Sequence, residues 1–507
     1  MQRISDLEYL KLSKLHKIGY KLACFFSGIP QKFVNLGKKI GSNFKRFGLW
    51  LYNDVKEIGT TFRDGDWKTR LSYIIFGFGS MARGQWLRGI LFLLFELTFI
   101  FYMVFWGGEM LHKLSLSPDV LREPGEDWVG DDYVWVPGDN TFKVLLYGIL
   151  TIVFIIAMIY TWRLNVRQNK IAEDIIKSGK KIKSNKDDLR SMIDDQFHKT
   201  LLALPTVGII VFTALPILFM IMIAFTNMDG VHNGRNNLFG WIGMDNFNEI
   251  LNFGGEDNVF AVTFGEILAW TLMWAFFATF SNYFLGMAVA MIINKKGIRF
   301  KKVWRTILVM TIAIPQFVSL LYVSHLFDND GAINGILLEW GWIETRIPFW
   351  TNMHWARALI IVINIWIGIP YLMLIATGIL MNIPEDLYES ARIDGANAFQ
   401  QYMKITLPYM LFVTGPYLLT SFIGNINNFN VIFLLSGGGP TNDKASAAGG
   451  AAGYTDLLVT WLFKMTSYDS NYKRASVIGI MIFLVVAIIS LIVYNLMPST
   501  KNEEDFS

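Results

Sequence analysis

Eight long apolar runs limit what this chain can fold into. Each is about 20 residues or longer, which is enough for a helix to cross a hydrocarbon core of about 30 Å. Because backbone N–H and C=O groups find no water inside a bilayer, such runs must be helical. The sequence therefore predicts an all-α, polytopic membrane protein with about eight transmembrane helices. The runs lie near residues 86–107, 143–162, 202–226, 267–293, 303–327, 357–381, 409–435 and 474–494.

Composition agrees with this class. Of the 507 residues, 53% are hydrophobic and only 17% are charged, whereas soluble proteins are nearer 45–50% apolar. Cys24 is the only cysteine, so an internal disulfide and a cysteine-based metal site are excluded. The basic N-terminus lacks a short apolar core followed by a small-residue cleavage site, so no removable signal peptide is expected.

The N-terminal region 1–70 carries 14 Lys or Arg and 6 Asp or Glu, interleaved with aromatic and aliphatic residues. Such a pattern favours amphipathic helices on the inner leaflet, with the basic face toward anionic lipid headgroups. Nucleic-acid binding is disfavoured because a membrane surface is already adjacent, and a tethered extension without a specific role is the alternative. Segment 71–85 is apolar but too short and glycine-rich to span, so we expect a re-entrant or interfacial piece.

After residue 70, the sequence divides into three further segments. We expect two additional N-terminal transmembrane helices in 71–200, a core of the remaining spans in 201–498 and a cytoplasmic tail in 499–507. Prolines recur within the spans, and broken helices at membrane depth suit a translocation path; kinks that serve packing alone are the alternative. These prolines are Pro205, Pro216, Pro315, Pro370 and Pro416.

Charge fixes the orientation. Segment 108–142 has 8 acidic and 2 basic residues, and the short connection 295–305 has six basic residues and no acidic one. Basic connections stay on the cytoplasmic side, so the first segment lies outside and the second inside. Counting spans from there places 382–408 and both termini in the cytoplasm. It places 227–266, 328–356 and 436–473 outside.

A polar stretch between two spans, 384–408, predicts a helix–glycine–helix elbow. Pro384 suits a helix start, and the acidic residues after it suit the helix dipole. Gly395 fits a left-handed C-terminal cap, and Asn397 or Ala396 begins the second helix.

The spacing in this elbow resembles the EAA loop of ABC importer permeases, which runs E-A-A, three residues, Gly, nine residues, Ile, one residue and Leu-Pro. Here it reads Glu389-Ser390-Ala391, Gly395, Ile405 and Leu407-Pro408, and only Ser390 departs from the pattern. An ordinary helical hairpin is the alternative. The resemblance implies that the elbow contacts an ATPase through Glu385, Glu389, Ser390, Ala391, Asp394, Gly395, Ile405, Leu407 and Pro408.

Polar side chains inside the spans are mostly uncharged. Span seven contains Ser421, Asn425 and Asn428, which share one face of a helix. Amides and hydroxyls can bind sugar hydroxyls without the desolvation cost of a charge; hydrogen bonding between helices is the alternative. Glu96 is the ionisable exception, and we favour a hydrogen-bonded helix contact over a proton relay.

From about residue 200 to 494 the chain resembles MalF-type subunits of maltose and maltodextrin importers, through strings such as WIGIPY and SFIGNINNFN. That resemblance implies a MetI-like type I permease core with broken helices and a mid-membrane sugar site. Gly424 stands where the maltose subunit has an aromatic residue, which removes a stacking surface, and 227–266 is far shorter than the corresponding enterobacterial domain. The implied substrate residues are Ile367, Gly368, Tyr371, Ser421, Gly424, Asn425 and Asn428.

The resemblance also implies partners. The outer string Gly453-Tyr454-Thr455-Asp456 matches maltose permeases and implies docking of an extracytoplasmic solute-binding protein; a flexible connection is the alternative. The chain has no phosphate-cradling GxxxxGK[ST] motif, so two copies of a separate ATPase subunit would bind the ATP. One elbow per chain implies a second, non-identical MalG-like permease.

We therefore expect a non-enzymatic permease subunit for an oligosaccharide such as a maltodextrin, in the cytoplasmic membrane. No catalytic residue, metal or cofactor of its own is expected. The alternatives are an ABC permease for another glycan such as a galacto-oligosaccharide, an ion-coupled secondary transporter, and a membrane scaffold that uses the basic arm.

Overall fold

The structure is a computed structural model that describes residues 41–42, 45–182, 184–234, 237–252, 258–295 and 297–496. Most of the basic region 1–70 and the tail 499–507, including both termini, lie outside the described residues. The chain divides into two compact units. The first joins Met1–Glu109 to Leu150–Ile209, and the second joins Met110–Ile149 to Ile210–Ser507.

Seven helices in the described part of the chain are long and apolar enough to cross a membrane. An eighth crossing is formed if the bent pair Lys301–Ala313 and Gln316–Leu326 counts as one span. This confirms the predicted polytopic, helical class with about eight spans. The seven helices are Trp86–Lys113, Thr141–Lys177, Phe197–Ile223, Val259–Asn294, Met353–Leu380, Ala398–Ile426 and Tyr472–Tyr494.

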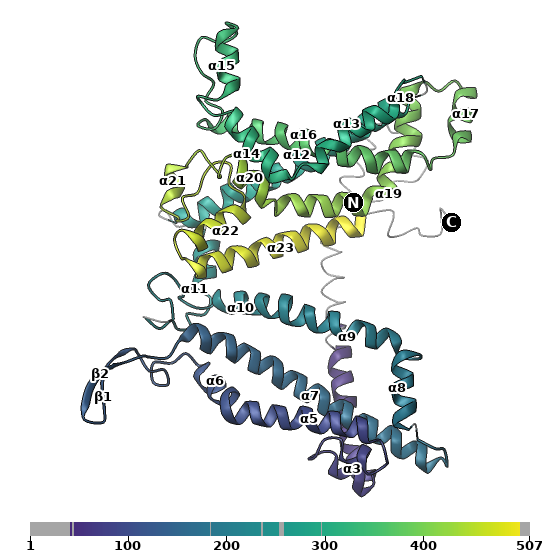
Figure 1. The fold of residues 1–507 in the computed structure, drawn as a ribbon, viewed down its shortest axis with the longest axis vertical. Coiled ribbons are helices and arrows are strands. Elements are labelled where there is room, and N and C mark those ends of the chain that lie inside the picture. The colour runs from purple at the N-terminus through teal and green to yellow at the C-terminus, as the bar shows by residue number, and fades with distance from the viewer. Residues whose placement is uncertain are drawn as a thin grey trace, which may run out of the picture. The chain divides into compact units, whose positions relative to one another are not determined.

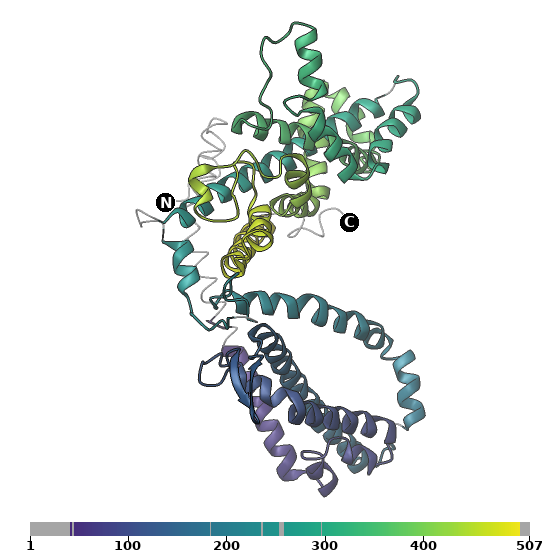
Figure 2. The ribbon, with the colours of Figure 1, turned by 60° about the vertical axis from the view of Figure 1, so that its left-hand side comes forward.

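The first unit contains short helices packed on two long ones. Residues 45–64 are helical, and the helices that follow are α3 Trp67–Leu71, α4 Phe78–Met81, α5 Trp86–Tyr102, α8 Asn185–Ile193, α9 Phe197–Ile209 and most of α7 Thr141–Lys177. Helices α5 and α7 lie side by side (Figure 1, Figure 2), and Phe95 and Phe99 of α5 contact Phe154 of α7 edge to face.

Segment 71–85 folds between these helices as turns and the short helix α4. Glu96 is buried, and its carboxylate accepts the Phe76 backbone N–H at 2.8 Å. The Asn165 side chain accepts the Gly77 N–H at 3.0 Å. Glu96 is therefore hydrogen-bonded, but to a turn and not to another helix as expected, and it satisfies a backbone N–H that has no partner within a helix.

The second unit holds the remaining elements, in chain order. They are α6 Gly108–Lys113, β1 Gly125–Val129, β2 Asp132–Val136, the π-helical turn η2 Ile210–Ala214, α10 Leu215–Ile223, α11 Asp245–Leu251, α12 Val259–Asn294, α13 Lys301–Ala313, α14 Gln316–Leu326, α15 Ala332–Glu339, α16 Met353–Leu380, α17 Glu385–Ile393, α18 Ala398–Gln401, η3 Tyr402–Thr406, α19 Leu407–Ile426, α20 Phe429–Leu435, α21 Asp443–Ser446, α22 Leu458–Ser467 and α23 Tyr472–Leu496.

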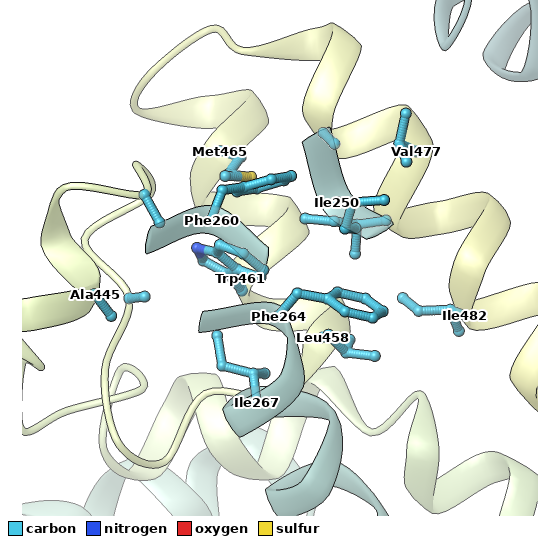
Figure 3. Packing of buried hydrophobic residues seen from close by; sticks show 14 of the residues in the cluster. Ile250, Phe260, Phe264, Ile267, Ala445, Leu458, Trp461, Met465, Val477 and Ile482 are labelled. Carbon is cyan, nitrogen blue, oxygen red and sulfur yellow. The ribbon is translucent and has the colours of Figure 1, made fainter. Parts of the chain in front are cut away.

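Helix α12 is central to this unit, because α16 and α19 both pack along it. Near one end of α12 lies a cluster of large apolar side chains that also draws on α22 and α23 (Figure 3). Trp461 and Phe260 meet there at a ring distance of 5.5 Å, and Trp461 is fully buried. Burial of such rings gives this part of the unit a fixed framework.

Two predicted spans have other boundaries. The run 409–435 is not one span: its helix starts at Ala398, passes through η3 and ends at Ile426, and α20 is separate. The break lies at Asn427 and Asn428, where the Asn428 side chain accepts the Val431 N–H at 3.2 Å and caps α20. Asparagine competes in this way for backbone hydrogen bonds.

The run 303–327 is broken at Pro315, where α13 and α14 meet at 89°. Proline lacks the N–H that would continue the helix, and it also disfavours helical backbone at the residue before it. Three other prolines, Pro205, Pro370 and Pro416, lie inside helices that continue through them. The predicted broken helix is therefore present at Pro315.

An ion pair holds the start of α23 to the loop between α10 and α11. The Lys473 ammonium lies 2.9 Å from Asp229 Oδ2, and Asp229 Oδ1 accepts the His232 backbone N–H at 2.8 Å. Burial alone would raise the pKa of Asp229, but these hydrogen bonds from His232 and Lys473 hold it well below its ordinary value.

We expect Asp229→Asn to lower thermal stability at neutral pH and to remove part of its acid dependence. A carboxyl with a lowered pKa stabilises the fold fully above its unfolded pKa of about 3.9 and loses that contribution as the pH falls further. Unfolding temperatures of both proteins across pH 3–7 check this. If the two curves stay parallel, the ion pair does not contribute.

Candidate functional site

The elbow has the geometry that its spacing predicts. Helix α17 ends at Ile393, and Gly395 follows with φ +78° in the left-handed region. The Ala396 N–H then donates to the Ala391 carbonyl at 2.8 Å, which satisfies a carbonyl at the helix end. Asn397 caps α18 through a reciprocal pair with Gln400.

The second helix continues into the membrane span, so the elbow is joined directly to α19. Ile405 lies in the π-helical turn η3, and Leu407 and Pro408 open α19. The Tyr388 hydroxyl lies 2.9 Å from Thr406 Oγ1, which ties α17 to this turn. Figure 1 shows α17 and α18 next to each other at the end of α19. Movement of α17 is therefore coupled to the start of α19.

The elbow presents a surface to its surroundings. Glu385, Glu389, Ser390, Asp394, Gly395 and Pro408 are exposed, and Ala391, Ile405 and Leu407 are half-buried. Two apolar side chains beside them are also exposed, Ile393 by 86% and Phe399 by 70%. These exposed apolar side chains are available for contact with another surface.

A cavity of about 350 Å³ opens at the break between α13 and α14. Two predicted substrate residues, Ile367 and Tyr371 of α16, line it. All its lining residues are uncharged, and the others are Thr311, Ile312, Ala313, Ile314, Pro315, Gln316, Ser319 and Trp366. Apolar walls with a few convergent polar groups are typical of a site for a neutral ligand.

Three other predicted substrate residues, Ser421, Gly424 and Asn425, lie on α19, and Asn428 follows the end of that helix. The Asn425 amide donates to Thr279 of α12 at 2.9 Å, and its Oδ1 accepts from Asn428 at 3.3 Å. Asn428 follows the end of α19, so the expected continuous face of Ser421, Asn425 and Asn428 is wrong. Their hydrogen bonds fit the interhelical alternative in part. Tyr371 approaches α19 through Tyr417, with ring centroids 6.4 Å apart.

At Gly368, α16 approaches α12 closely. A Cβ added to it would lie 2.4 Å from Asn282 Nδ2. Asn282 and Asn364 are both buried, and within the described residues Asn282 Oδ1 and Asn364 Nδ2 have no hydrogen-bond partner. Asn364 lies four residues before Gly368 and therefore on the same helix face. Orphaned amides next to the predicted site suit a hydroxyl-bearing ligand.

Gly424 differs from Gly368, because nothing lies within 4 Å of a Cβ added there. The open space leaves room for a ligand or for a larger side chain. Sequence reasoning missed Gln316, Ser319, Asn282 and Asn364. Asn364 is a single polar residue in an apolar run, and Gln316 and Ser319 interrupt another such run, a signal that could have identified these three.

The outer string predicted to dock a binding protein is largely inside the fold. Gly453, Thr455 and Asp456 are buried and Tyr454 is half-buried. The Asp456 carboxylate lies 2.7 Å from the Lys464 ammonium and accepts the Gly453 N–H at 2.7 Å. Burial raises the pKa of Asp456, and Lys464 opposes that rise. The string thus holds the shape of the loop around it.

Comparison with known proteins agrees with this geometry. The family described as binding-protein-dependent transport system inner membrane component matches residues 282–501. The galactooligosaccharides transport system permease protein GanP of Bacillus subtilis (strain 168) is 33% identical over 445 residues, which is 85% of this chain and 97% of that protein. The maltodextrin transport system permease protein MdxF of the same organism is 31% identical over 448 residues, 86% of this chain and 97% of its own length.

Other similarities cover less of the chain. MalF of Photorhabdus laumondii, a maltose/maltodextrin transport system permease protein, is 34% identical over 255 residues, 50% of this chain and 48% of that protein. Among solved structures, a bacterial alginate ABC transporter in complex with an alginate pentasaccharide-bound periplasmic protein is 21% identical and covers 62% of this chain and 98% of its own, with a TM-score of 0.48. By its full-length relatives, the chain belongs to the binding-protein-dependent transport system inner membrane components, as a permease subunit of the MalF type.

Proposed function

We propose that this chain is the permease subunit of an ABC importer that carries a neutral oligosaccharide across the cytoplasmic membrane by alternating access. The observation that carries the proposal is the uncharged cavity at the Pro315 break, with Ile367 and Tyr371 in its wall. The printed functions of GanP and MdxF, galactooligosaccharide and maltodextrin transport, support the same substrate class.

The residues around the cavity suit a sugar. Gln316, Ser319 and Tyr371 offer hydrogen bonds, and Trp366 and Tyr371 offer aromatic faces. We place Asn364 with the predicted substrate residues, because its amide is buried and lacks a partner within the described chain. Gly424 leaves space where an aromatic ring would stack, so we expect the site to accept a bulkier or differently linked sugar.

ATP hydrolysis in a partner subunit would drive transport through the elbow. The exposed Glu389, Ile393 and Phe399 would seat against an ATPase subunit, two copies of which would bind and hydrolyse ATP. Because α18 continues through η3 into α19, displacement of the elbow would shift Asn425 at the far end of the same helix. A second, MalG-like permease would complete the pathway.

The positive-inside rule supports the orientation. It places the connection 295–305 and the elbow in the cytoplasm and the loop 436–473 outside. A solute-binding protein would then dock on the outer side, where Tyr454 is half-buried in the loop that Asp456 holds. In the N-terminal region, exposed Phe47 and Trp50 lie on the helix 45–64 and suit insertion at a membrane interface.

Uptake assays test the proposal. In a strain that lacks this subunit, the wild-type gene should restore uptake of a maltodextrin or a galacto-oligosaccharide. Gly368→Val should reduce it about 5- to 160-fold, because overpacking against Asn282 costs roughly 1–3 kcal/mol and separates α16 from α12. Tyr371→Ala, at a half-exposed side chain, should reduce uptake without unfolding the protein.

Gly378→Val, on the same helix, is the matched control, since a Cβ added there meets open space. We expect it to keep wild-type uptake. Full uptake by both Gly368→Val and Tyr371→Ala would place the sugar elsewhere. If the wild-type gene restores neither sugar, the substrate class is wrong.

A further inference from the structure

A β-hairpin in the acidic segment 108–142 has no role in the proposed transport path. Strands β1 and β2 pair antiparallel from Gly125–Val136 to Val129–Asp132, and a two-residue loop of Gly130 and Asp131 joins them. Gly130 has φ +69°, which fits the type II′ turn of tight hairpins. Figure 1 shows the hairpin extended beyond the start of α7.

An isolated two-stranded hairpin is marginally stable in water, but this one has a fixed base. Asp139 Oδ2 accepts the Arg122 N–H at 2.9 Å, and the Lys113 ammonium lies 2.8 Å from Asp139 Oδ1. Leu116 and Leu121, in the segment that leads to the hairpin, are buried in an apolar cluster. These contacts hold the base of the hairpin in place, so we expect its outer side chains to stay exposed.

The hairpin exposes aromatic side chains. Tyr133 and Trp135 are two residues apart and lie on one face, and Trp135 is 64% exposed. Across the ladder, Trp135 is paired with Glu126, which is also exposed. Tryptophan and tyrosine are the side chains most enriched where protein interfaces gain their affinity.

The acidic charge of the hairpin indicates which kind of partner it can bind. The stretch Glu123–Asp132 contains five acidic residues and no basic one, namely Glu123, Glu126, Asp127, Asp131 and Asp132. Anionic lipid headgroups would repel this surface, which argues against the bilayer. A protein with a basic patch is the complementary occupant.

The hairpin is connected to the outer loop through described contacts. Tyr472, at the start of α23, packs against the apolar cluster of Leu116 and Leu121. Two residues later, Arg474 donates to the Ala448 carbonyl in that loop at 3.3 Å. A partner that pressed on the hairpin would therefore act on the same framework as the loop proposed for docking.

We propose that the hairpin is a docking surface for the extracytoplasmic solute-binding protein, which would meet it with a basic patch around a pocket for Trp135. This inference rests on the proposed importer function, because it takes the binding protein of that importer as the partner. The face also differs from the string 453–456, which is largely buried.

Binding to the assembled transporter in nanodiscs tests the proposal, with its sugar-loaded solute-binding protein as the probe. Trp135→Ala should raise Kd at least about tenfold, as expected for an aromatic anchor. Asp131→Asn with Asp132→Asn should raise Kd a few-fold and weaken its dependence on salt. Trp342→Ala, at a tryptophan that is 71% exposed elsewhere, is the matched control and should leave Kd unchanged.

A fluorescent label on the hairpin tests whether the hairpin contacts the bilayer or the solute-binding protein. In a Cys24→Ser background, Val134→Cys provides a single thiol on the hairpin for an environment-sensitive dye. We expect the binding protein to shift its emission and brominated phospholipids to leave it unquenched. Quenching by those lipids would overturn the proposal.

The outcomes separate this inference from the proposed function. Wild-type uptake of oligosaccharide, together with unchanged Kd in the Trp135 and the double Asp variants, would overturn the hairpin assignment alone. If the wild-type transporter neither imports oligosaccharide nor binds the solute-binding protein, both the hairpin assignment and the proposed function are wrong. Normal basal ATPase activity in each variant shows that the assembly is intact.

Discussion

Replacing Asp456 with alanine is expected to destabilise the second unit by about 3–5 kcal/mol. Asp456 and Lys464 form an ion pair in which neither side chain is more than 8% exposed. Removal of the carboxylate leaves the Lys464 ammonium buried without its counter-charge, and it also frees the Gly453 N–H and the Thr460 hydroxyl that bind Asp456. A large fall in unfolding temperature in detergent would report this loss.

Two further variants identify the cause. Asp456→Ala with Lys464→Met should recover much of the stability, because a buried pair can often be replaced by apolar groups at small cost. Asp330→Asn removes an exposed ion pair with Arg346 and should produce no measurable change. Equal melting temperatures for Asp456→Ala and the wild type would contradict the structural role of this pair.

The second large effect is expected at the elbow, where Gly395→Val should sharply reduce sugar uptake. At φ +78° a β-branched residue is a genuine outlier, and the left-handed conformation costs roughly 1–2 kcal/mol. That cost disfavours the assembled turn about 5- to 30-fold. We expect ATP hydrolysis to persist but to lose its coupling to transport, measured as sugar imported per ATP.

Asparagine is the control at this position, since it tolerates the left-handed region much better than valine. No atom lies within 4 Å of a Cβ added to Gly395, so Gly395→Asn should retain most of the coupling. A valine variant that assembles and imports sugar as the wild type does would show that this turn angle is not required.

Local signals predicted much of this fold. The apolar runs indicated the membrane helices, and Gly395 and Asn397 indicated the turn and the cap of the elbow because each acts through its own backbone. The break at Pro315 followed from the chemistry of one residue. The end of the seventh span was wrong, because Asn428 caps a separate helix instead of extending α19.

The candidate site was harder to predict, because it depends on which helices meet. Ile367 and Tyr371 came from a resemblance, but Gln316 and Ser319 enter the cavity only because α14 turns at Pro315. Asn425 binds Thr279 across 146 residues of sequence. The hairpin was missed because its strands lie in an acidic loop where charge outweighed the short β pattern.

The bend at Pro315 has a consequence for ion leakage. Helices α13 and α14 have 13 and 11 residues, so each is about 16–20 Å long and too short to cross the bilayer alone. They are also fastened to different neighbours: α13 packs on α16, whereas Ser324 of α14 donates to the Leu435 carbonyl at 2.6 Å. If the two halves move separately, one can close the path while the other opens, and we then expect no continuous water column across the membrane.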